Sequence, residues 1–390
     1  MNLSEILSKQ FLSLIPFMVS ITLLISSCFA IFRNKGNVKR ALVTFWSVTT
    51  LLYACHTLYF NNMMEVYPLS TVVYAVCNLL VYPLFLYYLF TITQEKPYPF
   101  LYFTIPAIVG GIATLSCYFA CAENYGQFIR EYLYKGNHVT SDTALLVTCI
   151  VHDICKVIFA AEVITVLFWG IRLIRAFNHR VDSFYSNNEE KSLNKITILL
   201  KIIFVISIFS FVFNILGRQF FENSIVLLSI PALLFTIILV FLGTTCLQQQ
   251  FTIHDLVFAE QGYKYGEDIA HKTVKTSTTP VLSQKKSDEL WDIINREVTE
   301  NRLFTYQNFN VSELSARINV NRTYIQQAIK DHTGRTFLEY TNETRLAYAE
   351  MLRKENPSRL IKSIIQEAGF ASPSAYYRAL KKTEKDKELE

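Results

Sequence analysis

Four ionisable side chains lie in one otherwise apolar stretch of the chain, residues 145–169. They are His152, Asp153, Lys156 and Glu162. Ionisable groups in an apolar segment are costly and usually face one another or a polar interior. Asp153 and Lys156 are three residues apart, so they share one face of a helix and can pair. The pattern predicts either a signal or proton site or a structural cluster that neutralises itself, and the sequence leaves both interpretations open.

Two polar helix faces near the end of the chain carry side chains suited to hydrogen bonding with base edges and phosphates. Arg and Gln make bidentate contacts with guanine and adenine, and Lys and Arg neutralise phosphates. The sequence therefore predicts that these faces bind double-stranded DNA. The candidate residues are Arg322, Thr323, Gln326, Gln327, Lys330, Ser374, Tyr377, Arg378, Lys381 and Lys382.

Motifs for catalysis, cofactors and metals are missing from the sequence. No G-x-S-x-G, H-E-x-x-H, P-loop or G-x-G-x-x-G pattern occurs, so we expect no enzyme and no cofactor. None of the eight cysteines lies after Cys246 and no C-x-x-C pair exists, so we expect no metal site. Cys117 and Cys121 are four residues apart, a helical spacing that suits a disulfide poorly.

Charged residues are distributed unevenly along the 390-residue chain. Residues 1–247 contain 28 of them (16 Lys or Arg, 12 Asp or Glu), whereas residues 248–390 contain 41 (21 and 20). This composition excludes a uniform soluble globule, a disordered chain and a small disulfide scaffold. It predicts a membrane domain at 1–247, a connector at 248–286 and a water-soluble domain at 287–390.

Seven apolar stretches are long enough to cross a lipid bilayer, which takes about 20 residues of helix. They are residues 11–32, 41–60, 69–92, 100–121, 145–169, 196–216 and 224–247. Ten Lys and Arg residues flank one side of these stretches: Arg33, Lys35, Lys39, Arg40, Lys96, Arg172, Arg175, Arg180, Lys191 and Lys195. Four flank the other: Lys9, Arg130, Lys135 and Arg218. The positive-inside rule then predicts an N-terminus outside and a C-terminal domain in the cytoplasm.

The longest outside segment, residues 122–144, is rich in aromatic side chains. Tyr125, Phe128, Tyr132 and Tyr134 alternate there with polar residues. We expect an aromatic belt at the membrane interface. A surface that reads a ligand is the alternative.

Residues 311–334 have the pattern of a helix, a tight turn and a second helix. We expect Ser312 to cap the first helix and Asn319 to adopt the left-handed conformation at the turn. Asn321 is expected to cap the second helix, and Gly334 to end it.

The same plan returns at residues 361–382, after a joining helix at 336–354. Gly369 and Phe370 form the corner there, and Ser372 with Pro373 is a good N-cap and N1 pair. The predicted fold is therefore all-α. A polytopic membrane bundle of about seven transmembrane helices precedes a cytoplasmic helical domain with two helix-turn-helix units.

Two helix-turn-helix units joined by one helix resemble the DNA-binding domain of AraC-type bacterial transcription regulators. The matching marks are V-S-E-L at 311–314, N-R-T-Y-I at 321–325, T-G at 333–334, F-x-x-Y-x-N-E-x-R-x-x-Y-A at 337–349, and G-F-x-S-P-S-x-Y-Y-R at 369–378. The resemblance covers residues 283–390. It implies sequence-specific DNA binding, with both recognition helices in successive major-groove segments.

The sequence departs from that family at three places. Ser315 and Ile365 stand where the family usually has Ala. After Lys382 the family continues into T-G and a short final helix, whereas this chain ends in the polar tail TEKDKELE, which we expect to be frayed.

The sequence thus predicts a membrane-embedded transcription regulator in the bacterial inner membrane. Its partners would be double-stranded DNA, the lipid bilayer, an unidentified signal ligand and a second copy of the chain in a homodimer. Two alternatives stay open: a transporter or channel with a regulatory cytoplasmic domain, and a protein-interaction adaptor with a degenerate helix-turn-helix domain.

Overall fold

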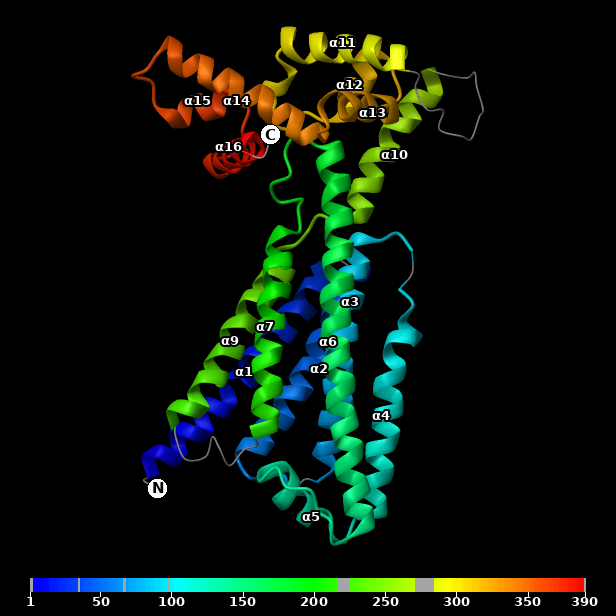
Figure 1. Cartoon of the computed structure of the whole chain (residues 1–390), viewed down its shortest axis with the longest axis vertical. Coiled ribbons are helices and arrows are strands. Elements are labelled where there is room, and N and C mark those ends of the chain that lie inside the picture. Colours follow the sequence, from blue (N-terminus) through cyan, green and yellow to red (C-terminus); the bar gives the residue numbers. More distant parts are fainter. Residues whose placement is uncertain are drawn as a thin grey trace. The chain divides into compact units, whose positions relative to one another are not determined.

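The computed structural model describes residues 3–33, 36–65, 68–96, 98–216, 225–270 and 284–388. Helices make up the described part of the chain, which contains no strand beyond one isolated bridge between Tyr185 and Asn310 (Figure 1). The all-α prediction is therefore confirmed. The chain divides into two compact units, Met1–Ile174 with Leu193–Gln250, and Arg175–Ser192 with Phe251–Glu390.

The first unit is built from long apolar helices. They are α1 (Leu3–Arg33), α2 (Asn37–Phe60), α3 (Leu69–Thr93), α4 (Phe100–Ala120), α6 (Thr143–Phe184), α7 (Asn194–Leu216) and α9 (Ile225–Gln248). The short helices α5 (Tyr125–Phe128) and η1 (Ile129–Tyr134) lie between α4 and α6 in the chain. The last ten residues of α6 are counted with the second unit, which begins at Arg175.

Six segments of the described chain are long and apolar enough to cross a membrane. They are Gln10–Phe32, Asn37–Phe60, Leu69–Thr93, Tyr102–Ala120, Thr143–Phe184 and Ser229–Gln261. The remaining predicted span, 196–216, corresponds to α7, most of whose last side chains are outside the described residues. Arg218 and Lys35, which entered the orientation argument, also lie outside the described residues.

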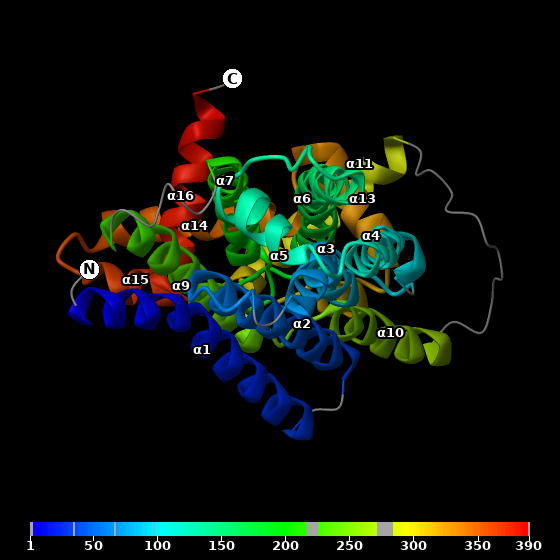
Figure 2. The same ribbon diagram turned by 90° about the horizontal axis from the view of Figure 1, so that it is seen from below.

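Small residues allow the apolar helices to approach one another closely. α1 packs against α2 and α9, while α3 packs against α2 and α4 (Figure 2). A Cβ atom built on Gly110 of α4 would lie 2.6 Å from the Leu79 side chain of α3, and one on Gly243 of α9 would lie 2.2 Å from Leu23 of α1. Glycine at such contacts is typical of membrane helix packing.

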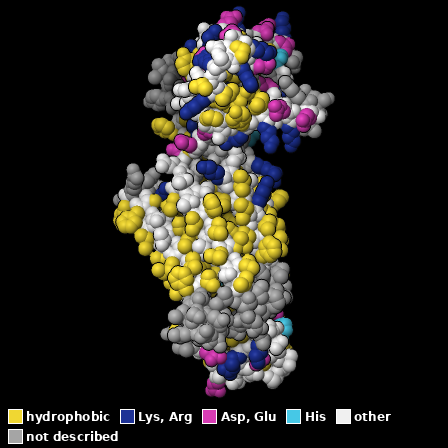
Figure 3. All heavy atoms as spheres, turned by 90° about the vertical axis from the view of Figure 1, so that its left-hand side faces the viewer, with side chains coloured by type: hydrophobic (Ala, Val, Ile, Leu, Met, Phe, Trp, Pro, Cys, Tyr) yellow, Lys and Arg dark blue, Asp and Glu magenta, His cyan; other side chains and the backbone are white. Residues whose placement is uncertain are grey.

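The outer surface of this unit is apolar, as expected of helices that face lipid. Figure 3 shows a broad area of hydrophobic side chains on one face of the unit, with Lys and Arg at its border. Large exposed side chains such as Phe29, Phe119 and Phe168 belong to this outer surface. A soluble protein rarely exposes an apolar area of this kind.

The second unit contains shorter helices. They are α10 (Ile253–Ala270), α11 (Gln284–Glu300), η2 (Leu303–Thr305), α12 (Val311–Ile318), α13 (Arg322–Thr333), α14 (Phe337–Glu355), α15 (Ile361–Glu367) and α16 (Pro373–Lys387). Of the predicted connector, residues 271–283 lie outside the described part, so its predicted flexible run is not described. α14 joins two helix pairs, α12 with α13 and α15 with α16.

The segment Arg175–Ser192, which comprises the end of α6 and most of the connection to α7, packs within this second unit. Its anchor is Arg345 of α14, whose side chain is 1% exposed. The guanidinium donates hydrogen bonds to the Ser186 carbonyl (2.6 Å), the Ser186 hydroxyl (3.1 Å) and the carbonyls of Phe304 (2.6 Å) and Tyr306 (3.0 Å). Burial lowers the pKa of Arg345 to about 9, which still leaves it protonated at neutral pH. Nothing in the spacing or composition of residues 175–192 indicates that this segment belongs to the C-terminal unit.

Candidate nucleic-acid interface and membrane cluster

The first helix pair is fixed by local side-chain to backbone hydrogen bonds. Asn310 caps α12, accepting from the backbone amides of Ser312 and Glu313, and Asn321 caps α13, accepting from that of Thr323. Asn319 at the turn is left-handed, with φ 52°. The prediction that Ser312 caps α12 is wrong, because the N-cap is Asn310, two residues earlier, and Ser312 is buried in the first turn of the helix.

The buried side of α13 determines which of its side chains point outward. Ile325, Ala328 and Ile329 are buried. Thr323 and Lys330 are exposed on the opposite side, and Arg322, Gln326 and Gln327 are half-buried. The five predicted residues of this helix therefore share one outward side. Gly334 ends the helix with φ 68°, as predicted.

The second helix pair has its own small core. Ile364, Ile365 and Phe370 are buried together with Ala349 and Leu352 of α14. The bulkier Ile365 is thus accommodated by packing against α14, and Ser315 in the first pair is satisfied by donating to the Val320 carbonyl at 2.7 Å. Neither departure from the family pattern disrupts its turn.

α16 presents the second set of predicted residues. Ser372 caps it, accepting from the Ala375 amide, and Pro373 is at N1. Ser374, Tyr377, Arg378, Lys381 and Lys382 are all exposed on this helix. The helix continues to Lys387, so the expectation of a frayed tail directly after Lys382 is wrong.

Four of the ten predicted DNA-binding residues already have a partner within the second unit. Gln326 donates to the Ser183 carbonyl at 2.7 Å, and the Arg322 guanidinium lies 5.7 Å from the centre of the Phe184 ring. Arg378 pairs with Glu189 at 2.8 Å, and Lys382 pairs with Glu339. Three of these four partners, Ser183, Phe184 and Glu189, lie at the end of α6 and in the turn that follows it.

Only some of the four ionisable residues of α6 come together as the predicted cluster. Lys156 pairs with Asp153 at 3.3 Å, as predicted. Both also bond to the Tyr132 hydroxyl, and His138 contacts Asp153 at 2.7 Å. Glu162 takes no part: both of its carboxyl oxygens are buried without a hydrogen-bond partner.

Tyr132 and His138 belong to residues 122–144, whose structure differs from a simple aromatic belt. Tyr125, Phe128 and Tyr132 are buried in one cluster with Met64 and Leu145. Burial, together with hydrogen bonding to Asp153, raises the pKa of the Tyr132 hydroxyl well above its usual value. Sequence spacing gave no sign of these partners, since 21 and 15 residues separate them from Asp153.

A cavity of about 650 Å³ lies inside the first unit beside this cluster. Its wall is mostly apolar and aromatic, with residues from α1, α2, α3, α6, α7 and α9. Its polar groups include Tyr82, Asn78, His56, Lys156 and His152. His152 is 8% exposed, and its Nε2 atom has no hydrogen-bond partner. A cavity of this size, with few polar groups in an apolar wall, is typical of a small-molecule site.

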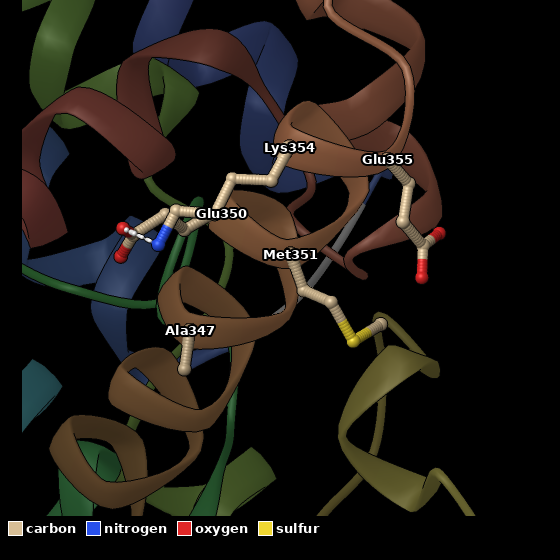
Figure 4. A pocket seen from close by; sticks show the side chains of 5 residues that line it. All are labelled: Ala347, Glu350, Met351, Lys354 and Glu355. Atoms are coloured by element: carbon tan, nitrogen blue, oxygen red, sulfur yellow. Dashed lines mark ion pairs between the residues drawn. The ribbon is translucent and has the colours of Figure 1, made fainter.

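A second, shallow hollow lies over α14 (Figure 4). It is lined by Ala347, Glu350, Met351, Lys354 and Glu355, all from one helix. Glu350 and Lys354 form an exposed i, i+4 ion pair at 2.8 Å. Side chains from a single exposed helix do not converge on a ligand, so this hollow is no candidate site.

The eight cysteines are free thiols, and the Cys121 thiol donates to the Cys117 carbonyl. The described residues contain no group of three or more His, Cys, Asp or Glu side chains placed to hold a metal ion.

Comparison with known proteins identifies one region. Residues 314–386 match the family described as a helix-turn-helix domain, and this match supports an AraC-type helix-turn-helix domain in the chain. That domain is a DNA-binding regulator domain and not an enzyme family. No curated protein and no solved structure matches the chain.

Proposed function

We propose that this protein is a membrane-embedded transcription regulator that binds specific DNA through the two helix pairs of its second unit. The observation that carries the proposal is the outward face of α13. A helix with a capped N-terminus and a buried apolar face presents Arg322, Gln326 and Gln327 inside the region that matches a DNA-binding domain. α16 supplies the second recognition helix, so that both helix pairs contact one duplex.

In this proposal the first unit crosses the bacterial inner membrane and holds the second in the cytoplasm, where DNA is available. The excess of Lys and Arg on one side of the spans supports this orientation. The cavity next to Asp153 and Lys156 supports a sensing role, since it would receive the signal ligand. α6 carries both residues and is one continuous helix to Phe184, which gives the signal a path along the chain.

The first test is selection from random DNA duplexes by the purified full-length protein in detergent. We expect one enriched sequence, and we expect Arg322→Ala to relax preference at a single base pair. A good bidentate contact contributes about 1–3 kcal/mol of discrimination, or about 5- to 150-fold. Unchanged enrichment with Arg322→Ala would contradict the assignment of that residue. No enrichment in the wild type would favour the adaptor with a degenerate domain.

A transporter or channel is the second candidate function, favoured by the same cavity and charge pair. It predicts flux of a solute into vesicles that contain the protein. This experiment distinguishes the two functions. A transporter or channel should show solute flux that Lys156→Gln abolishes, with or without DNA, whereas a sensor should show no solute flux.

A further inference from the structure

The segment Ser183–Glu189 contacts predicted DNA-reading residues of both helix pairs. At its start, the Ser183 carbonyl accepts a hydrogen bond from Gln326 of α13. At its end, Glu189 binds two groups of α16. Six residue steps separate the two ends, and an extended chain covers at most about 3.6 Å per residue, or about 22 Å. One short segment therefore spans both recognition helices on the same side of the unit.

Glu189 contacts α16 in the way a DNA phosphate would. Its Oε1 atom accepts from the Ser372 hydroxyl at 2.6 Å and from the Arg378 guanidinium at 2.8 Å. Ser372 is the N-cap of α16, where the helix dipole favours negative charge. Hydroxyl, guanidinium and helix N-terminus are the groups that proteins commonly turn toward phosphate oxygens. The Glu189 side chain is 24% exposed there, so it is well inserted.

The contact with α13 uses groups that would otherwise reach base edges. The Gln326 amide has its N–H group committed to Ser183, and Arg322 lies over the Phe184 ring. A glutamine that reads adenine directs the same NH2 group at the base, so it must turn away from Ser183 to make that bidentate contact. While the segment is in place, neither side chain can enter a major groove.

Other contacts keep the segment in this position. Arg345 holds the Ser186 carbonyl and hydroxyl, and the Ser186 amide donates to the Phe309 carbonyl at 3.0 Å. Asn188 donates to Asp182 at 2.8 Å and closes the turn that presents Glu189. The segment is thus a folded part of the unit, not a loop that touches it by chance.

We infer that the DNA-reading face is also the docking surface for the segment Ser183–Glu189, and that the segment and DNA compete for it. This inference rests on the proposed function. Glu189 takes the place of a backbone phosphate, and the Ser183 carbonyl takes the place of a base edge. DNA binds after the segment withdraws, so the apparent affinity for DNA depends on the fraction of molecules in which the segment is undocked.

The first experiment compares Glu189→Gln with Glu190→Gln in DNA binding by the full-length protein in nanodiscs. Both variants remove one negative charge from the same turn, but Glu190 is exposed and only Glu189 bonds to Ser372 and Arg378. A partly exposed ion pair is worth little, so we expect Glu189→Gln to bind DNA about two- to fivefold more tightly. Glu190→Gln should change the affinity for DNA less, because it removes a negative charge but no bond to Ser372 or Arg378.

Equal affinities of the two variants for DNA would overturn the competition. Hydrogen exchange gives an independent reading without DNA, since peptides covering residues 183–189 should exchange faster in Glu189→Gln than in the wild type. If the wild type and both variants bind no DNA, the proposed function fails. Faster exchange in Glu189→Gln would then still show the contact itself, which distinguishes the two failures.

A second experiment locks the segment in place. The second unit contains no cysteine, because the last one in the chain is Cys246 and none lies between 175 and 192. Glu189→Cys combined with Ser372→Cys should therefore be joined selectively by a short crosslinker that reacts with two thiols and is cleaved by reduction, and Glu190→Cys with Ser372→Cys is the matched control. We expect the locked protein to lose DNA binding at least tenfold and to regain it on reduction. A locked protein that binds DNA as well as the reduced form would overturn the inference.

Discussion

Replacing Arg345 with methionine tests how the C-terminal unit holds together. Methionine has a similar length and fills the space, but it cannot donate. The change removes the guanidinium donor from the Ser186 and Phe304 carbonyls and the Ser186 hydroxyl, and from the Tyr306 carbonyl, which keeps its bond from the Phe309 amide.

The magnitude follows from these four hydrogen bonds. A hydrogen bond to a charged group contributes about 1.5–3 kcal/mol, and a simple sum would exceed 6 kcal/mol. Two effects reduce that sum: the variant no longer buries a charge, and the freed carbonyls can relax toward water. Removing one partner of a buried charged network usually costs about 3–5 kcal/mol, which we expect here. That is a large share of the stability of a domain, typically about 5–15 kcal/mol.

The assay is hydrogen exchange of α14 amides in the full-length protein in nanodiscs, because the slowest amides report global opening of the unit. Arg345→Lys is the control that keeps the charge and can reach only some of the acceptors, so it should fall between the wild type and Arg345→Met. Ser186→Ala removes one of the four bonds and should cost about 1 kcal/mol. A loss below about 1 kcal/mol in Arg345→Met would refute the view that this side chain anchors the segment.

Two further predictions concern the turns and the phosphate contacts of the second unit. Gly369 has φ 91°, and an added Cβ would lie 2.6 Å from the carbonyl oxygens of Phe304 and Thr305. Gly369→Ala should therefore cost about 2–5 kcal/mol in a denaturant titration, whereas Gly334→Ala, with φ 68° and open space around it, should cost about 1 kcal/mol; similar costs would contradict the packing at Gly369. Lys381 is exposed on α16, so Lys381→Ala should weaken binding about equally to all duplexes and lower the slope of log affinity against log salt by about 1. A change in sequence preference would instead mean that Lys381 reads bases.

The parts that sequence predicted well are those set by near neighbours in the chain. The caps Asn321 and Ser372 and the positive φ of Asn319 follow from residue type and position alone. The buried faces of α12 and α13 follow from helical periodicity in the same way. Even here the start of α12 differs from the prediction, because its N-cap is Asn310 and not Ser312.

The parts that sequence did not predict depend on distant contacts. Arg345 lies 159 residues from Ser186, and nothing in the spacing of either indicates that they meet. The family pattern includes Arg345 but does not indicate a partner in the connection between α6 and α7. The polar cluster of α6 was incomplete for the same reason, since Tyr132 and His138 reach Asp153 from a segment that looked like an interfacial loop.

We propose that a protein embedded in the membrane reads specific DNA through its second unit. Genome-wide occupancy of the full-length protein in its own host is the decisive measurement, with an Arg322→Ala and Arg378→Ala double variant as the control. We expect discrete peaks that share one sequence and disappear in the double variant, while the protein stays in the membrane fraction at the same level. Absence of peaks under several growth conditions, or peaks that persist in the double variant, would contradict it.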